Sequence, residues 1–484
     1  FVGGTNLPQI NALQVRELAG GAYWNGLQNG TLDEVSTNYQ GGLSLAQITA
    51  SVANVYFADQ DQLGTAVANT NLTVAVGGLR IPNLFFVNTN KRYTVVGSDT
   101  NGLSGSSAIT VLGAGRAVLA GENTFTGNIL VDKGVLVLQH ERALGTSTKT
   151  LDVTLTTDTG GVELEGGITV PTGIVWQTSN QGPTQPAIRS VSGTNVIAGP
   201  IQLTGGGGNT RAVVESGSML TLAGLVTNIY IGARTLELGG AGAGVVAGTI
   251  SDGNSTTVLT GVTKDGAGTW TLAGTNTFVG GTVVNAGTLA LGADATLPSR
   301  NIALAGGAVL DVTAPGGFVL AADQTLQGSG LVTGAVSTVD GAKLIPGAPG
   351  TVGTLTFGGG LQLGAGTTNL FDLGAGTNDV VAVVGDLEPA NAVVRLAALV
   401  PPVSGSYPLF TYSGSKGTTF DPAVRHFLAT RTAVSLDETG TVGEVRLVVD
   451  AQAAQDLAWN PAVSATWDLG TSNWVDAVTR TVTD

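Results

Sequence analysis

Short runs of alternating apolar and polar residues fill the chain from about residue 63 to residue 449. Typical runs are Leu72–Val76, Ile129–Val131 and Leu289–Leu291, and most have the length of a β-strand, about four to six residues. Glycine, asparagine or aspartate separates the runs about every 8–12 residues. Helical spacing occurs only at Ser44–Val55 (SLAQITASVANV). The pattern therefore predicts an all-β chain with one short helix candidate.

The chain also contains an internal repeat. Residues 114–138 (AGRAVLAGENTFTGNILVDKGVLVL) align without gaps with residues 267–291 (AGTWTLAGTNTFVGGTVVNAGTLAL), and 13 of the 25 positions are identical. Identity of this extent at one fixed offset indicates a repeated structural unit rather than chance.

The shared positions of the repeat predict a coil with three strands and three corners. Glycine suits the corners, asparagine suits a left-handed or side-chain-bonded turn, and phenylalanine caps a corner and stacks on the next coil. The repeat-defining residues are Gly121, Asn123, Phe125, Gly127 and Gly134, with their counterparts Gly274, Asn276, Phe278, Gly280 and Gly287. Three short strands in roughly 20–25 residues are typical of one coil of a parallel β-solenoid.

The alternative is a β-sandwich built from hairpins. Tight hairpins favour two-residue Asn-Gly or Asp-Gly turns. The chain has few of these: Asn29-Gly30, Asn101-Gly102, Asp252-Gly253 and Asp340-Gly341. The solenoid is therefore the favoured fold.

Two stretches of the chain resemble a known family. Residues 266–292 (GAGTWTLAGTNTFVGGTVVNAGTLALG) resemble the passenger-associated repeat of autotransporters, also called the autotransporter-associated β-strand repeat. Residues 344–412 resemble the end of such passengers, with a Pro346-Gly347 corner, a strand at Gly353–Thr356 and an Asn378-Asp379 turn. The resemblance implies a right-handed parallel β-helix outside a Gram-negative-type bacterium. It says nothing about catalysis.

Tryptophan-rich blocks lie near the two ends of the chain. Trp24–Tyr39 aligns with Trp459–Trp474 at an offset of 435 residues, with Tyr39 opposite Trp474. The identical pairs are Trp24 and Trp459, Asn25 and Asn460, Thr31 and Thr466, Asp33 and Asp468, and Asn38 and Asn473. The blocks resemble the start of large repeat proteins in which such β-helices are strung together. The alternative is two unrelated caps that share tryptophan chemistry.

These blocks suggest a division into four parts. Residues 1–22 form a tail strand or linker, 23–62 a tryptophan-containing cap, 63–450 the β-helix, and 451–484 a tryptophan-rich segment that restarts the module or mediates assembly. The last eight residues, Ala477–Asp484 (AVTRTVTD), alternate as a strand does. Unpaired end strands of a solenoid invite another chain, so we expect head-to-tail assembly. The expected assembly residues are Phe1, Leu13, Val15, Trp24, Tyr39, Trp459, Trp467, Trp474, Val478 and Val482.

Composition excludes several classes of protein. The 484 residues include 74 glycines, no cysteine and a formal net charge of −14. Disulfide scaffolds and cysteine zinc sites are therefore impossible, and the acidic balance argues against nucleic acid as a partner. No run approaches 18 apolar residues, so no transmembrane helix is expected. Only 11% of residues are charged, which suits an extracellular fibre on the bacterial cell surface.

Candidate chemistry is sparse. His140 and His426 each lack a second histidine nearby and are interpreted as polar loop residues. The carboxylate pairs are Asp59 with Asp61, Glu163 with Glu165, and Asp372 with Asp379, and calcium could sit at Asp59/Asp61 or Asn378/Asp379. The glycine-rich run at 239–244 lacks the context of a dinucleotide loop and is interpreted as a corner. We expect no catalytic residue, no cofactor and no bound metal.

These observations predict a structural protein of the cell surface. It would be non-enzymatic and would assemble head to tail into a filament or stalk, with itself as the main partner. One alternative is a surface adhesin that binds glycans or neighbouring cells, which a contiguous exposed aromatic or apolar patch would favour. Another is a β-helical glycan-active enzyme, which a groove with three or more converging carboxylates would favour.

Overall fold

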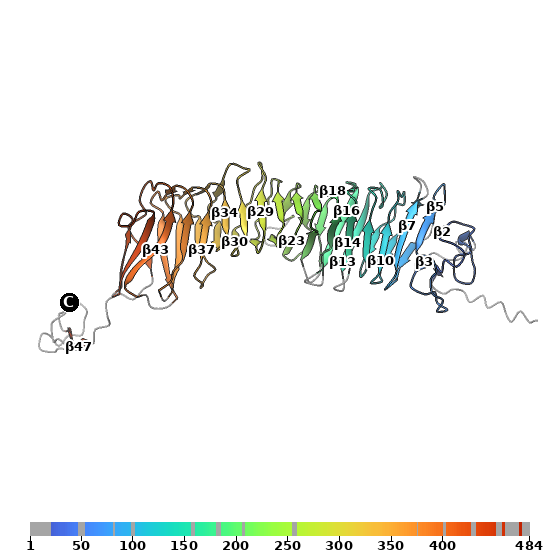
Figure 1. The fold of residues 1–484 in the computed structure, drawn as a ribbon, viewed down its shortest axis with the longest axis horizontal. Helices are drawn as coiled ribbons and strands as arrows, with labels where there is room; N and C mark the ends of the chain where they lie inside the picture. The colour runs from blue at the N-terminus through green and yellow to red at the C-terminus, as the bar shows by residue number, and fades with distance from the viewer. Residues whose placement is uncertain are drawn as a thin grey trace, which may run out of the picture.

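The protein is an elongated rod whose strands run across its long axis (Figure 1). The computed structural model describes residues 21–46, 54–80, 83–97, 102–155, 160–180, 185–205, 209–253, 259–374, 376–399, 403–426, 432–451, 457–459 and 474–476. The first coils lie at one end of the rod and β43 lies near the other.

Parallel sheets, which we call I to IV, form the sides of the rod. Sheet I contains β1 (Ala22–Tyr23), β3 (Asn54–Phe57), β6 (Asn83–Phe86), β9 (Ile109–Val111), β11 (Ile129–Val131), β13 (Lys149–Leu155), β16 (Ile174–Asn180), β19 (Ile201–Leu203), β22 (Val226–Asn228) and β25 (Ile250–Ser251). Sheet IV lies on the same side of the rod as sheet I, which we call the third face, but nearer the C-terminus. It contains β32 (Phe318–Leu320), β35 (Val336–Thr338), β38 (Leu361–Gln362) and β41 (Leu387–Glu388).

Sheet II runs almost the whole length of the rod. It contains β2 (Thr31–Leu32), β4 (Asn71–Val74), β7 (Arg92–Gly97), β10 (Arg116–Leu119), β12 (Val135–Leu138), β14 (Gly161–Glu165), β17 (Ile188–Ser192), β20 (Thr210–Val214), β23 (Arg234–Gly240), β26 (Thr260–Lys264), β28 (Thr282–Val284), β30 (Asn301–Leu304), β33 (Thr325–Gly328), β36 (Lys343–Pro346), β39 (Thr368–Leu373), β42 (Val393–Ala398) and β44 (Arg425–His426). Each of these strands pairs with the next in parallel.

Sheet III covers the remaining side from the first third of the chain onward. It contains β15 (Thr169–Val170), β18 (Thr194–Ile197), β21 (Met219–Leu222), β24 (Ala243–Val246), β27 (Thr269–Leu272), β29 (Thr288–Leu291), β31 (Val309–Asp311), β34 (Leu331–Thr333), β37 (Thr354–Phe357), β40 (Val380–Val383), β43 (Gly405–Tyr412), β46 (Glu444–Ala451) and β45 (Thr432–Asp437). Nearer the N-terminus, β5 (Leu79–Arg80) pairs with β8 (Leu103–Ser104).

Register between coils follows from the alternation of the strands. One coil advances by 19 residues from Arg116 to Val135 and by 26 residues from Thr210 to Leu236, which brackets the expected coil length. Alternate residues point inward, so like side chains stack along the rod, as Leu136, Val162 and Ile188 do in sheet II. This stacking buries a continuous apolar core, and the predicted all-β parallel solenoid is confirmed.

The third face changes sheet in the middle of the rod. Sheet I ends at β25 and sheet IV begins at β32. Between them the described chain makes one isolated parallel bridge, from Thr275 to Thr296. The coils therefore remain continuous through sheets II and III while their third side is interrupted.

Antiparallel pairing is confined to the ends among the named strands of the described chain. Strand β46 pairs antiparallel with both β43 and β45, so the last part of sheet III turns back on itself. Strands β47 (Leu457–Trp459) and β48 (Trp474–Asp476) form a separate antiparallel pair. The sandwich alternative is wrong because every other named strand pair is parallel.

The helix candidate at Ser44–Val55 is not borne out at its C-terminal end. Leu45 and Ala46 are helical, whereas Asn54 and Val55 begin β3. Residues 47–53 lie outside the described residues. Strand pairing with β6 through Asn54 and Val55 outweighs the weak helical spacing. The described residues contain no helix long and apolar enough to span a membrane.

Candidate functional site

The two repeat asparagines link three successive coils. Asn123 Oδ1 accepts the Leu103 N–H at 2.7 Å, and Asn123 Nδ2 donates to Ala143 O at 2.7 Å. Asn276 repeats the arrangement with the Ile250 N–H at 3.0 Å and Thr296 O at 2.9 Å. Neither asparagine has a positive φ. The prediction of a turn with a hydrogen-bonded asparagine side chain is therefore confirmed, and the left-handed alternative is wrong. The side-chain amide forms hydrogen bonds to the coils on either side.

The repeat glycines lie where a corner touches the preceding coil. A Cβ at Gly127 would overlap Ser107 O, and one at Gly280 would overlap Thr260 O. The same holds for Gly121, Gly134 and Gly274, each against backbone atoms of the coil before it. Gly287 combines close approach with a φ of +66°. At most of these positions glycine is needed because the backbone of the corner approaches the preceding coil closely, and not because the residue has a left-handed conformation.

The repeat phenylalanines are both buried, Phe125 at 1% and Phe278 at 0% exposure. The group over the Phe125 ring is the ammonium of Lys149, 3.8 Å from the ring centroid. The expected stacking of Phe125 therefore involves a cation of the next coil.

The N-terminal tryptophan block forms a hairpin with a buried aromatic centre, which we call the N-hairpin (22–39). Trp24 and Tyr39 form an antiparallel bridge, with their rings 5.4 Å apart edge to face. Trp24 is fully buried and its Nε1 donates to Asn69 O at 2.9 Å. Trp24 also packs beside Phe57 of β3, with ring centroids 6.2 Å apart. Trp24 and Tyr39 are thus buried in the first coils, whereas Leu27 and Val35 of the same loop are exposed.

Residues shared by the two tryptophan blocks hold this hairpin in shape. Asn38 Oδ1 accepts the N–H groups of Gln28 and Asn29, at 3.1 and 2.9 Å. Asp33 Oδ1 accepts the Val35 N–H at 2.9 Å. The positions that match between the blocks are therefore positions that fold the loop.

The C-terminal tryptophan block repeats the pairing of the N-hairpin. Trp459 of β47 is the antiparallel partner of Trp474 of β48. These two positions lie 435 residues beyond Trp24 and Tyr39, the offset found in the sequence alignment. We call 457–476 the C-hairpin. The remaining expected assembly residues, Phe1, Leu13, Val15, Trp467, Val478 and Val482, lie outside the described residues.

An aromatic ladder runs along the outer face of the first sheet I strands. The rings of Tyr23 and Tyr56 stack at 4.9 Å, and those of Tyr56 and Phe85 at 5.0 Å. Sugar recognition by aromatic stacking needs an open ring face. Here neighbouring rings cover one another's faces, so the ladder joins coils rather than offering a glycan platform.

Two further carboxylates, Asp386 and Glu388, were not singled out in the sequence and are occupied by hydrogen bonds between coils. Asp386 accepts the N–H and hydroxyl of Ser415, at 2.7 and 2.8 Å, and these bonds lower its pKa. Glu388 accepts the side chain and N–H of Thr418, which lower its pKa. A glycosidase acid needs a raised pKa. Neither group suits that task.

Glu163 and Glu165, a candidate carboxylate cluster in the sequence, have separate partners. Glu163 lies between two guanidinium groups: it bonds Arg116 and is 3.9 Å from Arg189. Glu165 instead accepts Gln139 Nε2 at 2.6 Å. Each carboxylate thus has its own structural partner, as expected of residues that bind successive coils together.

Asp379 is the exception, since burial raises its pKa to about 6. Its two oxygens accept the N–H groups of Gly353 and Asp372, both at 2.7 Å. Asp372 in turn accepts the Gly350 N–H at 2.8 Å. The pair therefore fastens the glycine-rich corner at 347–353. Asp379 is fully buried, so a substrate could not reach it.

The calcium candidates are likewise divided among separate turns. Asp59 bonds Thr89 and the Lys91 N–H, at 3.0 Å for both N–H groups. Asp61 bonds the N–H groups of Leu63 and Thr65. Among the described residues, no group of three or more His, Cys, Asp or Glu side chains could hold a metal ion.

The two histidines and the glycine run singled out in the sequence lie in turns, strands or corners of the coils. His140 Nδ1 accepts the Arg142 N–H at 3.1 Å within a turn, and His426 ends β44. The glycine run at 239–244 spans the corner between β23 and β24. A Cβ at Gly244 would overlap the Trp270 ring, so this run accommodates a core side chain.

Two buried lysines were not anticipated from the sequence. Lys264 occupies an inward position of sheet II between Leu238 and Val284, and it is fully buried. Its Nζ donates to the carbonyls of Asp265, Gly266 and Ala286, at 2.9, 2.7 and 3.0 Å. Lys149 donates to Phe125 O and Leu144 O. The alternation Val262-Thr263-Lys264 was the available signal, because it places Lys264 on the inward face.

Burial lowers the pKa of Lys264 to about 8. In the unfolded chain a lysine keeps its proton to about pH 10.4, so between about pH 8 and 10 the unfolded state binds more protons. The free energy of unfolding should therefore rise with pH in this window through Lys264. Thermal melts at about pH 7.5 and 9.5 give the melting temperatures of the native protein and of Lys264→Met. The melting temperature of the native protein should rise relative to that of Lys264→Met between the two pH values.

The exposed Lys343 on β36 supplies the matched control. Lys343→Met should leave the pH dependence of the native protein unchanged. If the difference in melting temperature between the native protein and Lys264→Met stayed constant with pH, the lowered pKa of Lys264 would be contradicted.

Comparisons with known proteins agree with the repeat. Residues 109–138 and 262–291 match the family model of the passenger-associated transport repeat, and the resemblance predicted from the sequence is confirmed. Among solved structures, the Haemophilus influenzae Hap adhesin matches at 12% identity with a TM-score of 0.22. The alignment covers 82% of this chain and 63% of the adhesin, so it spans less than two thirds of that protein's length. No curated protein matches the chain.

Proposed function

We propose that this protein is a non-catalytic rod of the bacterial cell surface that assembles head to tail through its ends. The passenger-associated repeats support a cell-surface or secreted location. A solenoid is stabilised by contacts between neighbouring coils and needs no cofactor. Its mechanical role would be that of a filament or stalk.

The observation that carries the proposal is the repeated hairpin. The N-hairpin and the C-hairpin share both their sequence pattern and their backbone pairing at one offset of 435 residues. In the N-hairpin this pattern starts a solenoid. A second copy at the other end supports extension of the rod from that end, by covalent continuation or by contact with another copy.

The last strand of sheet III supports the same proposal. Strand β45 pairs with β46 along one side in the described chain, whereas at the other end Tyr23 O of β1 accepts the Gln40 N–H and Thr31 O of β2 accepts Asn38 Nδ2. The free edge of such a strand can accept a strand from another molecule. Because the two ends differ, the contact is heterologous and yields open filaments rather than closed dimers.

An enzymatic function has less support. The candidate carboxylates Asp386 and Glu388 have lowered pKa values, and the one with a raised pKa, Asp379, is fully buried. Glycan hydrolysis requires an acid and a base or nucleophile that both reach one sugar. The described residues do not converge in that way.

An adhesive role has one favourable observation. The turn after β22 exposes Ile229, Tyr230 and Ile231, at 51%, 39% and 86%. Tyr230 is held by the guanidinium of Arg234, 4.2 Å from the ring centroid. A projecting apolar tip of this kind could contact a neighbouring cell or glycan, and it lies away from both hairpins.

Assembly is tested by sedimentation velocity over a wide range of protein concentrations. The native protein should form species whose mass grows with concentration, and the double variant Trp459→Ala with Trp474→Ala should remain monomeric. Tyr230→Ala is the matched control, because it removes an exposed aromatic ring outside the hairpins and should leave assembly unchanged. A native protein that stays monomeric at every concentration would contradict the proposal.

A further inference from the structure

Sheet III ends in an open strand edge near the C-terminal end of the rod. Its last strand, β45, pairs antiparallel with β46 along one side, where Leu436 lies opposite Leu447. Within the described chain, no backbone hydrogen bond reaches the other side of β45. Val434 and Leu436 are partly buried against the core, and Ser435 between them is exposed. The edge therefore has an apolar inner side and a polar outer side.

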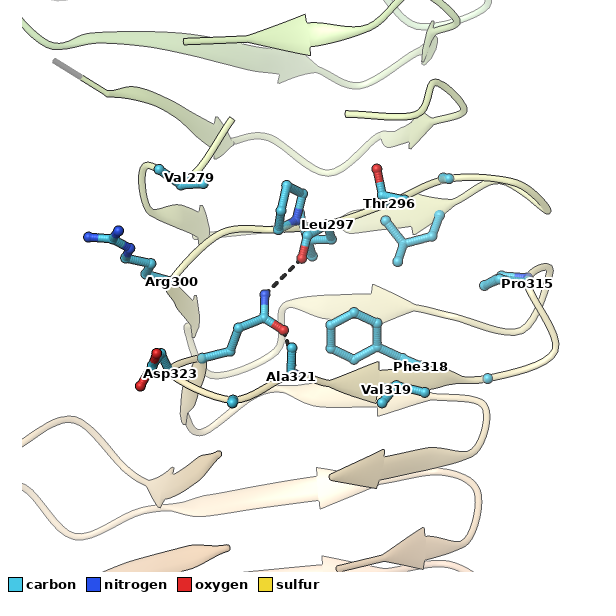
Figure 2. Close-up of a pocket in the computed structure, with 15 residues that line it drawn as sticks. Val279, Thr296, Leu297, Arg300, Pro315, Phe318, Val319, Ala321 and Asp323 are labelled. Atoms are coloured by element: carbon cyan, nitrogen blue, oxygen red, sulfur yellow. Dashed lines mark hydrogen bonds between the residues drawn. The ribbon is translucent and has the colours of Figure 1, made fainter. Parts of the chain in front are cut away.

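Two other sheet edges are closed by the molecule itself. At the N-terminal end, the Gln40 N–H donates to Tyr23 O of β1 at 2.8 Å. In the middle of the rod, Gln324 Nε2 donates across the third face to Leu297 O at 2.9 Å and to Ser299 O at 2.8 Å (Figure 2). The coils on either side of Gln324 also pair directly, through β29 with β31 and β30 with β33. These two edges are therefore less open to an added strand than β45.

We propose that residues 12–17 (ALQVRE) of a second copy add to the open edge of β45 as a parallel strand. The inference rests on the proposed function and names the donor and acceptor strands of the head-to-tail contact. Residues 12–17 lie outside the described residues. On the inner side of the sheet, Leu13 and Val15 would pack beside Val434 and Leu436. Main-chain hydrogen bonds would supply affinity, and alternate side chains would supply specificity.

The apolar pattern of this donor segment matches the strand that already pairs with β45. Strand β46 presents leucine, valine and valine at 447–449 to β45. The donor segment repeats the Leu-x-Val spacing at 13–15. The alternating stretch at 478–482 fits less well, because Arg480 lies on the same face as its two valines. Adding that stretch with its valines inward would also bring a charged group to the inner side, which is costly.

Charge sets the direction of the donor strand. In the parallel register Arg16 lies opposite Asp437, whereas the antiparallel register with the same apolar contacts places it opposite Ala433. The N–H groups of Gly440 and Thr439 donate to Asp437 and lower its pKa, so this carboxylate is charged at neutral pH. Opposite charges on facing positions of neighbouring strands attract. The parallel register is therefore favoured.

The reach of the donor segment requires a second copy. Leu13 lies eight residues before Gly21, where the described chain begins, and an extended chain of this length spans at most about 28 Å. The strands of sheet II from β2 to β44 stack over roughly 75 Å, and the first coils and β43 lie near opposite ends of the rod (Figure 1). The segment therefore cannot reach β45 of its own chain. Between two rods placed end to end, the same reach leaves room for the C-hairpin, whose two strands occupy ~10 Å.

The absence of cysteine from the chain makes disulfide trapping a sharp test. Gln14 would lie opposite Ser435, so the double variant Gln14→Cys with Ser435→Cys should form a ladder of covalent oligomers under mild oxidation. Gln14→Cys with Ser337→Cys is the matched control, since Ser337 lies on β35 in sheet IV. The control should cross-link at least about tenfold more slowly, because a disulfide requires Cα atoms within about 7 Å.

The direction of the strand is tested by charge in the same cross-linking variant. Adding Arg16→Glu should slow the formation of the ladder about two- to fivefold, because it places like charges at facing positions. Adding Arg16→Lys keeps the positive charge and should leave the rate unchanged. Equal rates for the two additions would contradict the parallel register.

Two cross-linking results would overturn the proposal. One is equal rates for the Ser435 and Ser337 pairs in protein that sedimentation shows to be assembled, which would leave the proposed function intact. The other is a disulfide within single copies. Protein that does not assemble at all would contradict both the proposed function and this contact.

Amide exchange provides a check without cysteine. Exchange at 432–437 should slow when the native protein assembles, because a donor strand would cover the open edge of β45. It should stay fast in the double variant Leu13→Lys with Val15→Lys, which carries charges on the inner side of the donor segment. Exchange at 432–437 that is equally fast in assembled native protein would also overturn the proposal.

Discussion

Replacing Gly280 by alanine should destabilise the coil that contains it by about 3 kcal/mol, the upper range for overpacking a close contact. The added Cβ would overlap the carbonyl oxygen of Thr260 in the preceding coil. That oxygen belongs to backbone of sheet II, so it cannot move aside without disturbing the pairing of β26 with β28. Because solenoid coils unfold partly independently, hydrogen exchange should show the loss chiefly at 260–284.

The neighbouring glycine provides the matched control. A Cβ at Gly281 would meet only Asn301 O, at 3.7 Å, which is ordinary contact. Gly281→Ala should therefore leave exchange at 260–284 close to that of the native protein. Equal protection in the two variants would mean that close approach does not explain the repeat glycine.

Replacing Asn276 by alanine should cost about 1–3 kcal/mol, because two backbone groups lose their partner and one of them, the Ile250 N–H, is buried, where an unsatisfied group costs about 1–3 kcal/mol. These groups are the Ile250 N–H and Thr296 O, which belong to the coils on either side. The loss of stability should be shared between the two coils that neighbour Asn276. Hydrogen exchange at Ile250, measured with the melting temperature of the whole rod, reports it.

Asn301→Ala is the control for this variant. Asn301 begins β30 and is exposed, so its removal should change stability by less than about 0.5 kcal/mol, as is usual for surface substitutions. If Asn276→Ala and Asn301→Ala had the same small effect, the asparagine rung would be ruled out as a source of stability.

The coil itself could be predicted from the sequence because each corner position has a strict local requirement. Glycine at Gly280 and asparagine at Asn276 recur at Gly127 and Asn123, and in both copies they serve the same contacts between coils. Alternation then set which side chains face the core. The sequence marked the N-hairpin as a repeated block but did not predict its antiparallel pairing; the shared residues Asp33 and Asn38 fold its loop.

Features that depend on the stacking of distant coils could not be predicted. The break in the third face follows from where β25 ends and β32 begins, and no local pattern marks it. Lys264 is buried because register places it between Leu238 and Val284. The carboxylates Glu163 and Glu165 lie close in sequence, yet neighbouring coils supply different partners to each. The deciding contact in these cases lies one or two coils away along the chain, as between Arg116 and Glu163, 47 residues apart.

The most direct test of head-to-tail assembly is cryo-electron microscopy of the purified native protein, at a resolution that traces the junctions between rods. We predict regular filaments in which the C-hairpin of one copy lies against β1 to β3 of the next. Isolated rods, with the C-hairpin in contact with no other molecule, would contradict it.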